Sequence, residues 1–196
     1  SRPAEDSAVI TASVPTTTSV RGTFVLNTFD FVREHFGPDA LTRLQRKLPQ
    51  SLQSLLDIRT NSWVPLDDLV ACMTAAKAAL APRDPRFYWT MGCYGGRHLR
   101  TLWVGIIFGE PLRALQCCQL LWRTFVGAGR LEVIPGQGAA TLRVVDLPVA
   151  APFCERLHGS FEGLFSVSAV PMRVEKRACT SRGDAYCELF VERQAH

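Results

Sequence analysis

The chain has 196 residues, of which 47% are hydrophobic, and its formal net charge is +4. A chain of this length fits one domain that buries a core without disulfide bonds. The basic excess is small and scattered, with no run of five like charges, which argues against a nucleic-acid-binding protein. No apolar stretch approaches the roughly 18 residues of a membrane-spanning helix, and the first 19 residues lack the apolar core of a signal peptide.

The N-terminal half is expected to be a disordered arm followed by helices. Residues 1–19 are rich in Ser, Thr, Ala and Pro without periodicity, so we expect an arm there and a single domain over 20–196. Apolar residues then recur at helical spacing, beginning with Val25, Phe29, Val32 and Phe36. Trp63-Val64-Pro65 is interpreted as a hinge. Helices are expected over 25–36, 39–48, 65–80, 87–108 and 111–126.

The C-terminal half changes to a period of two, which is typical of strands. A hairpin is predicted over 131–147, with its turn at Gly136-Gln137-Gly138. A helix over 151–165 precedes strands over 170–178 and 186–192, which flank the turn Arg182-Gly183-Asp184. The fold class is therefore α+β: a helical first half packed on a four-stranded antiparallel sheet, with a β-β-α-β-β second half.

Seven cysteines are present, an odd number at irregular spacing, which does not fit a secreted disulfide framework and favours a cytoplasmic protein. Three of them are expected to converge. Cys179 and Cys187 flank the predicted hairpin turn, and Cys154 begins the preceding helix with His158 one turn further on. Thiolate and imidazole suit tetrahedral zinc. Simple packing of small side chains and a cross-strand disulfide are the alternatives.

The segment Cys154 to Phe190 resembles the 4-vinyl-reductase domain, a family with a cysteine, a glycine-spaced helix and a Cys–Gly-Asp–Cys hairpin in this order. Its members include the sensor domains of phenol-responsive bacterial transcription activators. The start Val20-Arg-Gly-Thr and the later His35-Phe36-Gly37 are similar to haem nitric-oxide-binding domains and their myxobacterial paralogues. These families share one superfamily fold with the TRAPP vesicle-tethering subunits. The resemblance implies a ligand-binding domain that dimerises through the helices of its first half.

The resemblance also bears on cofactors. In the phenol sensors the matching cysteines bind structural zinc, with a Glu three residues before the first hairpin cysteine. Lys176 stands at that position here, so His158 is the expected fourth ligand if zinc is bound. Haem is not expected, because the sequence lacks the Tyr-x-Ser-x-Arg motif of the haem-binding family and Gly95-Gly96-Arg97-His98 is not its histidine pattern.

Aromatic residues of the central helices are candidates for an apolar pocket, with ordinary core packing as the alternative: Phe87, Tyr94, Trp103 and Trp122. The favoured function is a non-enzymatic sensor that binds a small apolar molecule and signals through protein contact. A TRAPP-like scaffold that binds a GTPase or a sister subunit is the alternative. An enzyme is not expected, since the sequence has no Gly-x-Ser-x-Gly elbow and only four histidines.

Overall fold

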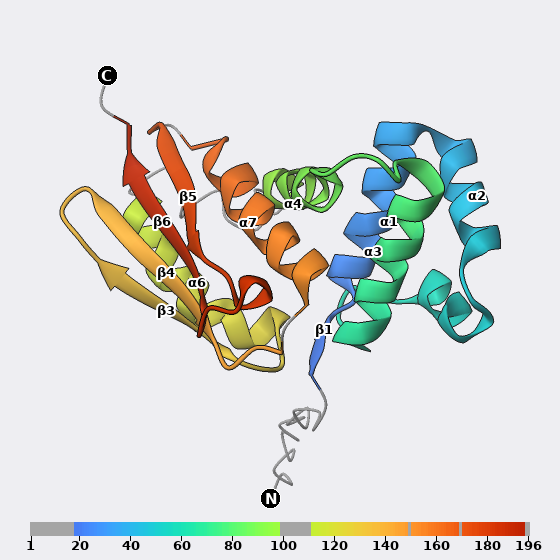
Figure 1. The fold of residues 1–196 in the computed structure, drawn as a ribbon, viewed down its shortest axis with the longest axis horizontal. Coiled ribbons are helices and arrows are strands. Elements are labelled where there is room, and N and C mark those ends of the chain that lie inside the picture. The colour runs from blue at the N-terminus through green and yellow to red at the C-terminus, as the bar shows by residue number, and fades with distance from the viewer. Residues whose placement is uncertain (1–17, 99–110, 149, 169, 195–196) are drawn as a thin grey trace, which may run out of the picture.

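The computed structural model describes residues 18–98, 111–148, 150–168 and 170–194, and its fold is α+β (Figure 1). Residues 1–17 of the predicted arm, and Trp103, lie outside the described residues. Among the described helices, none is both long and apolar enough to cross a membrane. Figure 1 shows three parts side by side: the four-stranded sheet, a central pair formed by α4 and α7, and the group α1 to α3.

The first half is helical, as predicted. Its elements are α1 (Thr23–Phe36), α2 (Pro38–Lys47), the 3-10 helix η1 (Gln50–Asp57), α3 (Leu66–Leu80) and α4 (Phe87–His98). Helix α1 buries Val25, Phe29 and Val32, the face that the spacing indicated. It ends at Gly37, whose φ of 86° lies in the left-handed region that glycine tolerates, and Pro38 starts α2.

The predicted hinge at Trp63-Val64-Pro65 is wrong, because this segment is a strand. β2 (Trp63–Pro65) pairs antiparallel with β1 (Ser19–Arg21), and Val20 opposite Val64 is fully buried. Val20 also bridges to Val126, which follows α6. Each strand has only three residues, and their partners are distant in sequence, so no local period could reveal them.

The second half follows the predicted order. Helix α6 (Pro111–Phe125) leads into β3 (Arg130–Pro135) and β4 (Ala139–Val145), and α7 (Ala151–Phe165) precedes β5 (Met172–Ala178) and β6 (Cys187–Arg193). The sheet order is β3-β4-β6-β5, with all neighbours antiparallel. Arg143 and Glu188 are register partners on β4 and β6, and Nε and Oε2 of their side chains lie 2.8 Å apart. The predicted fold class is therefore confirmed.

Helices α4 and α7 touch backbone to backbone through glycines spaced four residues apart. A Cβ added to Gly92 would lie 2.1 Å from the Arg156 carbonyl oxygen, and one added to Gly96 would lie 2.1 Å from that of Ser160. From the other side, a Cβ on Gly159 would lie 2.0 Å from the carbonyl oxygen of Trp89. Glycine thus fixes the close crossing that joins the helical half to the sheet half.

Candidate functional site

An apolar cavity of about 100 Å³ lies where the two halves meet, between α1, α6, α7 and β3. Its largest wall residues are the aromatic ones: Phe24, Trp122, Phe125 and Phe161. The residues that α6 and α7 contribute to the cavity wall recur at helical spacing, so each set lies on one face of its helix. On α7, positions 157, 161 and 164 are four and three residues apart, and on α6 positions 118, 121, 122 and 125 follow the same rule.

Three of the polar groups in the cavity wall, those of Trp122, Ser160 and Thr23, have partners inside the protein, and Asn27 is a further polar residue of the wall. Trp122 Nε1 donates to the carbonyl oxygen of Ala128 at 3.1 Å. Ser160 Oγ donates to the carbonyl oxygen of Arg156 at 2.9 Å, and Thr23 Oγ1 donates to that of Thr60 at 3.2 Å. A ligand in this cavity would therefore meet mainly carbon and sulfur atoms.

Of the four aromatic residues predicted to line a pocket, the structure places Trp122 in the cavity wall. Phe87 and Tyr94 instead pack edge-on against Phe31 of α1, with ring centroids 5.6 and 5.8 Å apart. Trp103 lies outside the described residues. The sequence reasoning missed the α7 wall, although the spacing of Leu157, Phe161 and Leu164 carried its signal.

Arg156 lies behind the cavity and was not predicted. Its side chain is 1% exposed and no carboxylate pairs with it among the described residues. Its guanidinium donates to the carbonyl oxygen of Phe24 at 2.7 Å and to Thr28 Oγ1 at 2.8 Å, and it sits 5.2 Å from the centroid of the Phe24 ring. Burial lowers the pKa of Arg156 to about 9. Arg156 thus holds α7 against α1 beside the cavity wall.

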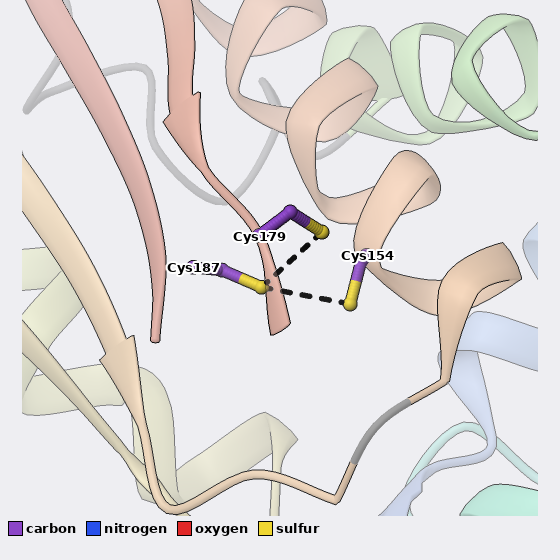
Figure 2. A group of neighbouring side chains, drawn as sticks. All are labelled: Cys154, Cys179 and Cys187. Atoms are coloured by element: carbon purple, nitrogen blue, oxygen red, sulfur yellow. Dashed lines mark hydrogen bonds between the residues drawn. The ribbon is translucent and has the colours of Figure 1, made fainter. Parts of the chain in front are cut away.

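Cys154, Cys179 and Cys187, the three cysteines that were predicted to converge, lie close together (Figure 2). Cys154 comes from the first turn of α7, Cys179 follows β5, and Cys187 begins β6. Cys187 Sγ lies 3.6 Å from Cys154 Sγ and 3.7 Å from Cys179 Sγ, and all three sulfurs lie within 4.8 Å of one another. Gly183, with φ of 93°, provides the left-handed turn that lets the chain return to this point.

Hydrogen bonds favour the ionised form of Cys187 over that of Cys154. The Thr180 backbone N–H donates to Cys187 Sγ at 3.4 Å, and the Thr180 hydroxyl lies at the same distance. The hydrogen bond with Cys154, followed by those with Thr180, lowers the pKa of Cys187 to about 5 despite its burial. The same contact with Cys187, together with burial, raises the pKa of Cys154. The contact between the two sulfurs thus shifts the pKa values of Cys187 and Cys154 in opposite directions.

His158 is not part of the cysteine cluster, although it lies on the same helix as Cys154. Its Nε2 lies 3.0 Å from Glu162 Oε1, and burial lowers its pKa in spite of that carboxylate. The amino group of Lys176 likewise pairs with a carboxylate, with Nζ 2.5 Å from Glu155 Oε1. A metal-ligand role for the three cysteines and His158 stays a prediction.

The comparisons with known proteins reveal a shared fold. No protein-family model matches the sequence, and no curated protein matches it. Among solved structures, an Fe(II) unliganded H-NOX protein from K. algicida superposes with a TM-score of 0.70 at 10% identity, covering 90% of this chain and 97% of that one. The H-NOX protein from S. oneidensis in its Fe(II)NO state gives a TM-score of 0.67 at 13% identity, covering 89% and 99%. An oxygen-binding H-NOX domain related to soluble guanylate cyclases gives 0.64 at 14%, covering 89% and 95%.

These superpositions correct the cofactor prediction made from the sequence. The sequence led us to expect no haem and to consider zinc. The structural comparisons contradict that expectation, because solved structures that share the fold include H-NOX proteins described with Fe(II) iron and heme. None of these neighbours is described with zinc or as a 4-vinyl reductase.

Proposed function

We propose that this chain is a ligand-binding sensor domain that holds a small apolar molecule in the cavity between α1, α6, α7 and β3. The observation that carries this function is the position of the cavity. It is walled by both halves of the molecule, so a ligand there contacts α1 on one side and α6 with β3 on the other. The likeness to H-NOX domains, whose described states include Fe(II)NO and oxygen complexes, supports a sensor role.

The cavity favours an uncharged ligand of few heavy atoms. Its volume of about 100 Å³ is below the roughly 150 Å³ of an engineered apolar cavity that binds benzene or xenon. Desolvating a charged ligand here would be costly, because the wall groups of Trp122, Ser160 and Thr23 are already paired and Asn27 is the remaining polar side chain of the wall. A larger apolar ligand requires α1 and α6 to move apart.

Haem is the larger candidate that the fold suggests, and the cavity chemistry fits it in part. The apolar walls suit the faces of a porphyrin, and a bound haem would supply an iron centre for a diatomic ligand. Cys118 is the described wall residue whose atom type serves as an axial ligand of haem iron. Burial raises the pKa of this thiol to about 12, so an iron ion would have to displace its proton.

Two neighbouring leucines of α6 provide a matched test of the small-ligand site. Leu121 lines the cavity, whereas Leu120 is 80% exposed. We expect xenon and benzene to bind the wild-type protein and Leu120→Trp with the same affinity, measured by chemical-shift changes of the wall methyl groups. Leu121→Trp fills the cavity and should weaken binding at least about tenfold. Equal binding by both variants would refute the site.

Haem loading is tested separately with Cys118 and Cys117, which are adjacent on α6. Only Cys118 lines the cavity. Hemin added to the wild-type protein should give a shifted Soret band and one haem per chain, and Cys118→Ala should change the position of that band whereas Cys117→Ala should not. Identical spectra in both variants would exclude Cys118 as the ligand.

The proposed sensor would signal through contact with a partner protein. Helix α6 carries cavity residues on its inner side and the exposed Leu120 on its outer side, so one rigid element connects ligand and surface. A homodimer through the helices of the first half is the expected assembly, and light scattering during size-exclusion chromatography measures it. A monomer at all concentrations would contradict the expected dimer.

A further inference from the structure

The three-cysteine cluster has the geometry of an oxidation site. Cys187 is partly exposed, whereas Cys154 is 5% exposed and Cys179 is fully buried, so a small oxidant meets Cys187 first. Both buried sulfurs lie against it, at 3.6 and 3.7 Å. A disulfide needs about 2.05 Å between sulfurs, and rotation of the Cys187 and Cys154 side chains between rotamers can supply the remaining approach.

The surroundings of Cys187 prepare its sulfur for attack on an oxidant. The Thr180 N–H donates to this sulfur at 3.4 Å and stabilises negative charge on it, and the Thr180 hydroxyl lies at the same distance. Exposed reactive cysteines with such donors and a second thiol in contact are the ones that are oxidised first.

We propose that Cys187 and Cys154 form a peroxide-responsive thiol pair whose disulfide ties the first turn of α7 to β6. Cys154 is the favoured partner over Cys179 because its sulfur is slightly closer and less engaged elsewhere. Cys179 Sγ lies 3.0 Å from Ser181 Oγ, whereas the other contact of Cys154 Sγ, to Thr180 Oγ1, is 3.8 Å long.

The reaction balances with hydrogen peroxide as the oxidant. The Cys187 thiolate attacks one peroxide oxygen, the O–O bond breaks, and the leaving hydroxide takes up the proton released by the Cys187 thiol to form water. The Cys154 sulfur then attacks the sulfenic acid sulfur of Cys187, the S–O bond breaks, and the second hydroxide takes the Cys154 proton. Two thiols and one peroxide give one disulfide and two waters, and each sulfur loses one electron.

The disulfide would join two residues that are 33 positions apart in the chain, one in α7 and one in β6, whose sulfurs now lie in contact without a covalent bond. Helix α7 carries Leu157, Phe161 and Leu164 into the cavity wall, so fixing its first turn to β6 restrains that wall. Oxidation itself requires nothing of the cavity, so its test is independent of the proposed ligand.

The test uses the full chain, reduced, treated with chelator and freed of reductant under nitrogen, then exposed to one equivalent of hydrogen peroxide. We expect a mass loss of about 2 Da per chain, reversed by dithiothreitol, and a Cys154–Cys187 peptide pair after proteolysis under acid conditions. Cys187→Ser should slow the loss of free thiols at least about tenfold, whereas Cys117→Ser, a half-buried cysteine outside the cluster, should leave it unchanged.

Peptide mapping of the wild-type protein keeps the outcome decisive even if Cys187→Ser folds poorly. A disulfide between Cys187 and Cys179 would overturn the assigned pair. Wild-type protein that keeps all seven thiols, or that forms sulfinic acid at Cys187 without a disulfide, would overturn the oxidation site as a whole.

Discussion

Replacing Gly96 by alanine should separate the two central helices and destabilise the protein. The added Cβ would lie 2.1 Å from the Ser160 carbonyl oxygen and 2.8 Å from the Leu164 nitrogen. Both neighbours are helix backbone and cannot rotate away, so α4 and α7 must move roughly 1 Å apart. Such overpacking costs typically about 1–3 kcal/mol, and the better helix propensity of alanine returns up to about 1 kcal/mol. The expected net loss is about 1–2 kcal/mol.

The neighbouring Gly95 gives the matched control on the same helix. The closest atom to a Cβ at this position is Asn27 Nδ2, at 3.5 Å, which is ordinary contact. Gly95→Ala therefore gains helix propensity without a clash, and the free energy of unfolding should rise by about 0.5–1 kcal/mol. Adjacent and chemically identical substitutions are thus expected to have opposite signs.

Urea denaturation followed by circular dichroism measures both effects. A loss of about 1–2 kcal/mol for Gly96→Ala corresponds to a fall in melting temperature of about 2–8 °C for a chain of this size. If Gly96→Ala were as stable as Gly95→Ala, the backbone contact between α4 and α7 would not exist as described.

Two further predictions concern charged groups of α7. Arg156→Ala should lower the free energy of unfolding by about 3 kcal/mol, because it removes a buried side chain together with its hydrogen bonds to the Phe24 carbonyl oxygen and to Thr28 Oγ1. Thermal melts measure this loss, and a loss as small as that of the exposed Arg123→Ala would contradict it. Burial lowers the pKa of His158 below 6.5, so the unfolded chain takes up this proton first as the pH falls. The stability that the neutral His158 contributes is complete above pH 6.5 and decreases below it. The urea midpoint of the wild-type protein should therefore fall between pH 7 and 5, and that of His158→Gln should fall less. An equal fall in both proteins would show that His158 does not cause the pH dependence.

The fold was largely predictable because its elements are long and periodic. Helix α7 matched its predicted bounds, and the turn at Gly183 placed β5 and β6 on either side of it. The pair β1 and β2 was not predictable, since three-residue strands carry no period and Val20 meets Val64 only through the tertiary fold.

The cysteine cluster was predictable because the positions of its residues along the chain, on either side of a turn and at a helix start, are enough to bring them together. Cys179 and Cys187 flank one turn and Cys154 begins the helix before it, so their convergence follows from local structure. The cavity depends on how α6 crosses α1 and α7, which no single segment encodes. Phe87 and Tyr94 are as aromatic as Trp122, yet they face α1 in the core, and composition cannot distinguish the two locations.

Strand β1 has a consequence for how the protein opens. Ser19 accepts a backbone hydrogen bond from Gly127, Val20 bridges Val126, and Arg21 Nε donates to the Thr124 carbonyl oxygen. Three residues thus hold the end of α6, where Phe125, its last residue, and Val126, which follows it, belong to the cavity wall. Such a short strand unfolds locally at far lower cost than the whole domain. Its detachment would free the end of α6 and give a ligand its entry route, so amide hydrogen exchange at β1 would report the frequency of opening.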